Sequence, residues 1–344
     1  MARDRSVLLD AGGRSLRRPV AYFDHSTLVD AFFGKRGEGE DVALNAELAA
    51  IVEDVARRGA LCLSPAHIIE LIPWPTRADA PAMGAWLDGL DPAWFQMEGS
   101  AEDELTNEVM RRVGLKSAPA PRLPVHYAMT AAMRDNLKAA TRVEVHDFLS
   151  SPDVASLIRK LHGNAKLTDN AKTAGAQSIA LFRRTHEDRA SIPEGTPPER
   201  VREVTGMKLR VQLQIDARQA ISSTALPLGE DYPTDTEITQ AVLAAVDDPD
   251  AIPMTKIGYH LQGNVADVIT RQDPTKGRFN VRYRSFAWDT RHALAAAVVD
   301  VFTCDSFVDS VMGDFRTKRG MNTQLSAHRR DRSTLVAELR RQCA

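Results

Sequence analysis

Short apolar runs and helical patterns alternate in the first part of the chain. The run at 19–24 (PVAYFD) predicts a buried strand that ends in an acid, and the run at 60–63 (ALCL) predicts a second strand. Apolar positions recur at helical spacing over 28–33 and again over 42–58. A further helix is expected after the pair 64–65, because Ser favours the N-cap and Pro the first helical position. This order of elements is typical of a parallel α/β sheet.

Cap residues give the expected bounds of these helices. Ser26 and Thr27 are the candidates for the N-cap of the first helix, and Gly59 is expected to end the second. A third short strand is expected near 94–97, followed by a helix over 100–113.

The middle of the chain differs, because strand patterns fade between about 125 and 265. A Pro-rich segment at 118–124 marks the boundary before it. Helical spacing predicts a large insertion or accessory subdomain, with helices at 126–140, 151–162, 198–221, 234–246 and 254–270.

The α/β pattern returns at 289–305. Asp289 is placed to open an Ala-rich helix, where an N-cap carboxylate accepts free backbone N–H groups. A tight turn is expected near Asp300, followed by a short apolar strand over 301–304 and then by Asp305.

We therefore predict an α/β fold in which the runs 20–24, 60–63 and 301–304 share one parallel sheet. The predicted divisions are a flexible basic arm at 1–18, a first core part at 19–115, a mainly helical insertion at 116–274, a second core part at 275–320 and a C-terminal helix within 321–344.

The composition excludes several classes of protein. A hydrophobic content of 43% and a charged content of 26% are ordinary for a globular protein, and the net charge of -2 means that any surface for a polyanion is local. Cys62, Cys304 and Cys343 have neither zinc-site spacing nor a disulfide framework, which favours a reducing compartment. No stretch approaches the roughly 18 apolar residues of a membrane span, and no signal-peptide pattern is seen. We expect a cytoplasmic protein that does not bind membranes.

Acids stand at the predicted ends of several elements. Asp24 and Asp305 follow strands, Glu70 lies in the helix after the second strand, and Asp289 opens the late helix. Because the carboxyl ends of parallel strands meet at one edge of a sheet, these four carboxylates could converge there. Close like charges raise carboxyl pKa values unless a cation neutralises them, and oxygen ligands favour Mg²⁺ or Mn²⁺. Such ions can activate water for attack on a phosphodiester.

Each of these residues also has a structural interpretation. Asp24 could be a plain strand-end residue, Glu70 a solvated helix residue, and Asp289 and Asp305 a cap and a turn residue. We interpret Asp300 as serving the turn before the last strand.

Three histidines flank the predicted site in the sequence. His25 and His67 lack metal-ligand spacing and are candidates only for supporting the acids. His292, one helical turn after Asp289, is interpreted as a packing residue, with a hydrogen bond to a carboxylate as the alternative.

At these residues the chain resembles the PIN-domain nucleases. The segment 22–30 (YFDHSTLVD) looks like the opening strand of that family, in which an acid is followed by a small hydroxylated residue. The segment 63–71 (LSPAHIIEL) resembles its second motif, a Ser six places before a Glu. Asp289 and the segment 301–307 (VFTCDSF) resemble its third and fourth acids, the last in a Thr-x-Asp context.

The resemblance implies a PIN-like three-layer fold and a Mg²⁺- or Mn²⁺-dependent ribonuclease with a metal-activated water as nucleophile. The implied metal ligands and catalytic residues are Asp24, Glu70, Asp289 and Asp305, and the implied substrate-binding residues are Ser26, Thr303, Arg284 and Arg291. A structure-specific DNase of the same superfamily is an alternative, because recognition of the RNA 2′-OH depends on pocket detail.

A binding module that keeps the fold without cleaving is a third possibility. The family often has an acid or Asn two places after the last acid, where this chain has Phe307, and Asp309 stands four places after it. The insertion is also longer than in compact members of the family, and it could carry a protein partner or a homo-oligomer interface.

Basic and aromatic residues alternate just before the late helix. Arg282, Arg284 and Arg291 are interleaved with rings such as Tyr283 and Phe286 in a segment that either contacts a nucleic acid or forms a two-faced strand. The arginines stand close to Asp289 in the sequence, so we expect a nucleic-acid partner, with RNA favoured.

Overall fold

The computed structural model describes the chain in separate ranges. They are 17–71, 79–94, 100–115, 154–161, 197, 200, 211, 213–219, 221, 232–248, 251–261, 289, 292–305, 308–309, 312–313 and 331–344. The helix predicted at 126–140 and the substrate-binding candidates Arg284 and Arg291 lie outside the described residues.

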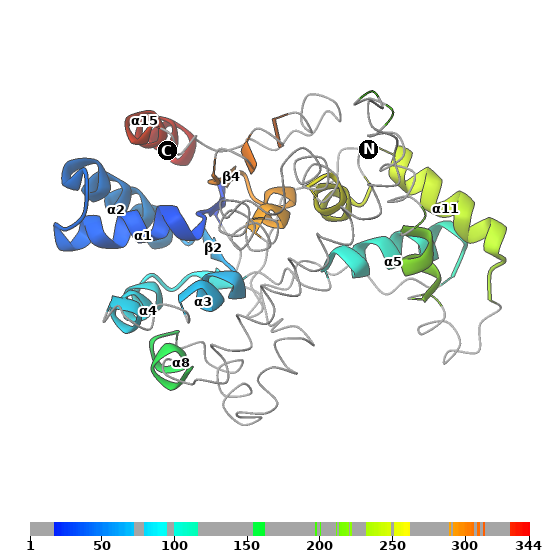
Figure 1. Cartoon of the computed structure of the whole chain (residues 1–344), viewed down its shortest axis with the longest axis horizontal. Coiled ribbons are helices and arrows are strands. Elements are labelled where there is room, and N and C mark those ends of the chain that lie inside the picture. Colours follow the sequence, from blue (N-terminus) through cyan, green and yellow to red (C-terminus); the bar gives the residue numbers. More distant parts are fainter. Residues whose placement is uncertain are drawn as a thin grey trace.

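The described residues form a mixed α/β structure that is mostly helical (Figure 1). In chain order its elements are β1 (Ala21–Tyr22), α1 (His25–Arg36), α2 (Val42–Arg57), β2 (Leu61–Leu63), α3 (Pro65–Leu71), α4 (Asp79–Gly89), β3 (Ala93–Trp94), α5 (Ser100–Arg112), α8 (Val154–Leu161), α11 (Asp235–Asp247), the 3₁₀ helix η2 (Ala295–Ala297), β4 (Val301–Phe302) and α15 (Arg332–Cys343). None of the helices among these residues is long and apolar enough to cross a membrane.

A four-stranded parallel sheet in the order β3-β2-β1-β4 lies at the centre. Ala21 of β1 is paired with Leu61 of β2 on one side and with Val301 of β4 on the other. The expectation that these three runs share one parallel sheet is therefore confirmed. The structure also contains the third strand, β3, which begins at Ala93.

Helices cover both faces of the sheet. Because successive strand residues point to opposite faces, Ala21 and Phe23 pack with α1, α2, α4, α8 and α15, whereas Val20 and Tyr22 face the other side. On that second side the sheet packs against residues of 254–261 and 293–299. Burial on both faces explains why the strands read as continuous apolar runs.

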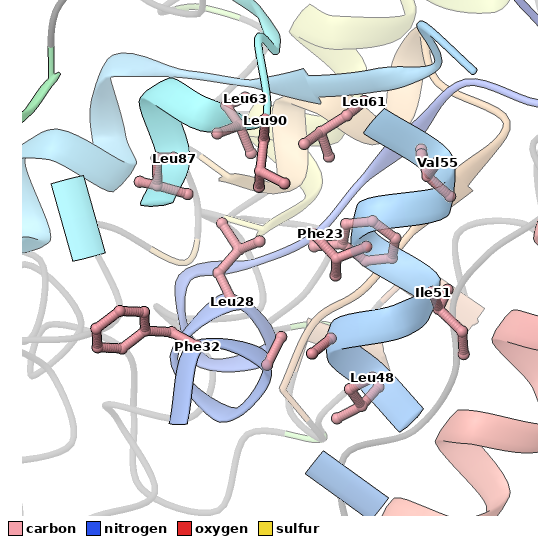
Figure 2. Packing of buried hydrophobic residues seen from close by; sticks show 14 of the residues in the cluster. Phe23, Leu28, Phe32, Leu48, Ile51, Val55, Leu61, Leu63, Leu87 and Leu90 are labelled. Carbon is pink, nitrogen blue, oxygen red and sulfur yellow. The ribbon is translucent and has the colours of Figure 1, made fainter. Parts of the chain in front are cut away.

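The first face is built around a close contact between α1 and α2. Figure 2 shows the two helices beside each other, with Leu28 and Phe32 on α1 and Leu48 and Ile51 on α2, all members of one buried cluster. Gly34 lets the two helices approach, because a Cβ at this position would lie 2.1 Å from the backbone carbonyl carbon of Asn45.

The helix α8, from the predicted insertion, packs directly on this core. Asp88 of α4 accepts hydrogen bonds from the backbone N–H groups of Val154 and Ala155, at 2.5 and 2.8 Å, and so satisfies the start of α8. A Cβ on Gly84 would lie 3.0 Å from the Cα of Ala155, so the two helices are in close contact.

A separate apolar cluster joins α5, α11 and the helical residues within 213–221. Leu105 and Val109 of α5 pack there with Ile238 and Val242 of α11. Figure 1 places this cluster away from α1, α2 and α15, on the other side of the sheet strands. The predicted division of the chain at 115 and 116 stays a prediction, although α5 precedes it and packs with helices that follow it.

Several local predictions can be compared with the observed ends of elements. Gly59, at φ 68°, follows α2 as expected. The side chain of Asp300 accepts from the N–H of Val20 at 2.9 Å and pairs with Arg18, so it ties the residue before β4 to the segment before β1, and its role in the turn stays a prediction. The expected N-caps of α1 were wrong, because the cap is Asp24, whose side chain accepts from the N–H of Thr27. Asp289 is itself helical, so the helix does not begin after it.

Gly34→Ala is expected to destabilise the protein by roughly 1–3 kcal/mol, because the added methyl group forces α1 and α2 apart. The matched control is Gly89→Ala at the exposed end of α4, where an added Cβ meets nothing within 4 Å. That change should be neutral or stabilise by up to about 1 kcal/mol. Urea unfolding of both variants measures the difference, and equal midpoints would contradict the close helix contact.

Candidate functional site

Asp24 lies at the carboxyl end of β1 and is held by two threonines. Its Oδ1 accepts from the N–H of Thr27 at 3.2 Å, the hydroxyl of Thr27 at 2.5 Å and the hydroxyl of Thr303 at 2.9 Å. The backbone N–H of Asp24 in turn donates to the Thr303 hydroxyl at 2.8 Å. The carboxylate is thus fixed as the N-cap of α1 and tied to the end of β4.

Two of the predicted substrate-binding residues fall within the described part of the chain. Thr303 is buried, with 1% of its surface exposed. Its hydroxyl accepts from the backbone N–H of Asp24 and donates to the carboxylate of the same residue. This places Thr303 as a support for the acid. Ser26 lies half-buried in the first turn of α1.

Glu70 of α3 lies beside two histidines. Its Oε2 accepts a hydrogen bond from Nε2 of His292 at 2.7 Å, and Nδ1 of His25 lies 3.8 Å from the same oxygen. The interpretation of His292 as only a packing residue is therefore wrong, and the alternative of a hydrogen bond to a carboxylate is confirmed.

Tyr22 connects this pair to the end of β2. Its hydroxyl lies 2.5 Å from Nδ1 of His292 and 2.6 Å from Oγ of Ser64. Tyr22 and Ser64 are fully buried, and His292 is 3% exposed. A continuous line of side-chain hydrogen bonds therefore runs from Ser64 through Tyr22 and His292 to Glu70.

His67 makes a different set of contacts. Its Nε2 lies 2.8 Å from the carbonyl oxygen of Phe23, and its Nδ1 accepts from the N–H of Ser64 at 3.1 Å. Burial, followed by the charge of His292, lowers the pKa of His67 to about 3, so its ring is neutral. His67 thus joins the ends of β1 and β2 as an uncharged side chain.

The electrostatics around Glu70 differ from those expected for a cluster of acids. Burial by itself raises the pKa of Glu70, but the charge and hydrogen bond of His292, followed by the charge of His25, outweigh it. The pKa of Glu70 is lowered to about 2, so the carboxylate is ionised at neutral pH. Burial also raises the pKa of Tyr22 well above its ordinary value, so its hydroxyl keeps its proton.

Asp305 is half-buried after β4, and its Oδ1 accepts from the N–H of Val308 at 2.8 Å. It closes the turn into the next helical residues, which matches its structural interpretation. Asp289, also half-buried, is the remaining predicted acid.

The described residues include all four predicted acids. No three His, Cys, Asp or Glu side chains of the described ranges are placed so that they could hold one ion. One oxygen atom of each of three acids accepts a hydrogen bond from the protein. Oδ1 of Asp24 and Oδ1 of Asp305 each accept from a backbone N–H, and Oε2 of Glu70 accepts from His292. The metal site with four carboxylates stays a prediction.

Tyr22 and Ser64 were not among the site residues predicted from the sequence. In the sequence, Tyr22 is one apolar position of a strand and Ser64 a helix cap. A Tyr in a buried strand indicates that some residue must form a hydrogen bond with its hydroxyl, but the sequence does not identify that residue.

Comparison with known proteins finds no match among family models, curated proteins or solved structures.

Glu70→Gln is expected to lower stability by about 1–3 kcal/mol at neutral pH, because the ionised carboxylate is favoured in the folded protein. The folded pKa of about 2 lies below the ordinary 4.5, so this contribution is complete above pH 4.5 and is lost as the pH falls toward 2. Urea unfolding of wild type and variant across this range measures it.

The control for that experiment is Glu47→Gln, which removes an exposed carboxylate of α2 that pairs with Arg340. A change of less than about 1 kcal/mol is expected there. A wild-type advantage over Glu70→Gln that stayed constant from pH 7 to pH 2 would contradict the lowered pKa of Glu70.

Proposed function

We propose that this chain is a PIN-like nuclease that acts on RNA, with its site at the carboxyl edge of β2, β1 and β4. One observation carries the proposal: three of the four predicted acids follow these three strands, which are neighbours in one parallel sheet. Asp24 directly follows β1, Glu70 lies in the helix after β2, and Asp305 follows β4. In open parallel sheets, ligands bind beyond this edge.

The support of Asp24 agrees with such a site. Its three hydrogen bonds from Thr27 and Thr303 all end on Oδ1, so they fix the direction in which Oδ2 points. A carboxylate that is held by neighbouring donors loses little further freedom when it binds a ligand. Thr303 of the Thr-x-Asp sequence, which directly follows the adjacent strand β4, provides this support.

A negative edge needs a cation before it can accept a phosphodiester. Glu70 is ionised at neutral pH and would repel a phosphate group that approached it. The proposal therefore includes the requirement for Mg²⁺ or Mn²⁺ that the family resemblance implies, although the described side chains do not form a site for three-residue coordination. A DNA substrate is the alternative within the same proposal.

A non-catalytic PIN-like binding module is the second candidate. The observation that favours it is the use of Asp24 and Asp305 as structural acceptors at the starts of helical segments. One oxygen of each acid thus has a structural role in the fold that does not depend on cleavage. In that case the helices of the predicted insertion would carry the interface for RNA or for a protein.

Purified protein with Mn²⁺ is expected to cleave labelled RNA, and a chelator should abolish the cleavage. Asp24→Asn and Asp305→Asn should each lower activity by at least about 100-fold, because they remove charge while keeping an oxygen that accepts the cap hydrogen bonds. The control is Asp54→Asn on α2, an exposed acid paired with Arg57 and Arg58. Activity that survives chelator, or that survives in both site variants, would reject this proposal. Labelled DNA run in parallel decides the substrate.

Metal binding can be measured without a substrate. If the acids bind Mn²⁺ in the folded protein, saturation at 100 times Kd adds about 2.7 kcal/mol to the free energy of unfolding. Thermal melting with and without Mn²⁺ should show this gain in wild type and in Asp54→Asn but not in Asp24→Asn. The absence of any response in wild type would favour the binding module.

A further inference from the structure

The line of hydrogen bonds behind Glu70 joins three elements that are distant in the sequence. Ser64 stands between β2 and α3, Tyr22 lies in β1, and His292 belongs to the helical residues before β4. The Tyr22 hydroxyl contacts Ser64 and His292, and His292 contacts Glu70. Ring contacts add to this arrangement, since the His292 ring packs against those of His67 and Tyr22 at centroid distances of 4.7 and 5.7 Å.

We propose that Ser64 and Tyr22 fix the proton of His292 on Nε2, and that His292 thereby acts as the positioning residue that holds the Glu70 carboxylate at the sheet edge. The effect of His292 on catalysis rests on the proposed function. The hydrogen bonds and the position of the proton do not depend on it.

The direction of each hydrogen bond follows from what each group can donate. Ionised Glu70 only accepts, so Nε2 of His292 carries the proton of that bond. With a single proton on the His292 ring, Nδ1 is an acceptor, and the Tyr22 hydroxyl donates to it. The oxygen of Tyr22 can then accept from the hydroxyl of Ser64. Every buried polar atom on this line has a partner, as burial requires.

Other histidines near Glu70 are not suited to this role. His67 uses both ring nitrogens on the backbone, toward Ser64 and Phe23. Nδ1 of His25 lies 3.8 Å from Oε2 of Glu70, which is too long for a hydrogen bond and leaves a charge interaction. His292 is therefore the histidine that sets the orientation of the carboxylate.

Orientation matters here because α3 is short and Glu70 lies near its end. A helix of seven residues is not stable by itself, and a Glu side chain has several rotamers to choose from. Tyr22 is fully buried in the sheet and therefore held in place. Its hydrogen bond restrains His292, which in turn restrains the Glu70 side chain. A group that positions a metal or catalytic ligand typically changes affinity or activity by 10–100-fold when it is removed.

The first experiment locates the proton in the full-length wild-type chain. Long-range ¹H–¹⁵N NMR of the histidine rings distinguishes the two tautomers, and the His292 signals are assigned by their loss in His292→Gln. We expect a protonated Nε2 and an unprotonated Nδ1 for His292. A proton on Nδ1 would overturn the proposal, whether or not Nε2 also carries one.

The second experiment removes one hydroxyl. Tyr22→Phe should shift the His292 ring signals while leaving those of His67 in place, because His67 is held by the backbone. The matched control is Tyr259→Phe, which removes a hydroxyl that donates to Asp216 at 2.7 Å in a different part of the molecule. Unchanged His292 signals in Tyr22→Phe would overturn the role of Tyr22, and the wild-type measurement stands even if that variant fails to fold.

The third experiment connects the arrangement to cleavage. With labelled RNA and Mn²⁺, His292→Leu should lower kcat by 10–100-fold with little change in KM, and His292→Gln should restore part of the loss because an amide N–H can still donate to Glu70. Equal losses in His292→Leu and His292→Gln, or a similar loss in Tyr259→Phe, would overturn the positioning role. If wild type shows no cleavage, the proposed function fails, and the NMR result alone decides the hydrogen-bond arrangement.

Discussion

The hydrogen bonds between Thr303 and Asp24 hold together parts of the chain that the sheet alone would join only weakly. β1 and β4 have two residues each in the ladder, so their pairing contributes few backbone hydrogen bonds. The Thr303 hydroxyl extends this pairing by one step, since it accepts from the N–H of Asp24 and donates to its carboxylate. The same carboxylate starts α1, whose contact with α2 builds the first face of the core. One side-chain pair thus sets the end of the sheet, the first helix and the candidate site.

The two faces of the sheet are built on different principles. The face toward α1 and α2 is apolar and depends on close packing, including the contact at Gly34. The opposite face includes Tyr22, whose hydroxyl would be costly to bury without its partners Ser64 and His292. The hydrogen bond between Tyr22 and His292 therefore helps to determine how the helical residues before β4 pack against the strands, beside the candidate site.

The sequence allowed the order of the strands and helices in the core to be predicted, because local patterns determine it. Apolar runs located β1, β2 and β4, and Gly59 located the end of α2. It did not allow the partners of polar groups to be predicted. The cap of α1 is Asp24, the acid that ends the strand segment, whereas cap preferences favour the hydroxylated residues after it. The contact between His292 and Glu70 spans 222 residues. Contacts of that kind depend on the packing of the whole fold, which no local pattern contains.

The position of β1 in the middle of the sheet has a consequence for the synthesis of the protein. Its partner on one side, β2, follows within 40 residues of Ala21, but the contact with the β4 side joins Val20 to Asp300, 280 residues later. At 5–20 residues per second, a ribosome needs roughly 15–60 s to make that distance. Throughout this interval the edge of β1 that pairs with β4 lacks that partner, and uncovered edges invite pairing with other chains. The nascent protein therefore passes through a long stage in which chaperones have a strand edge to protect.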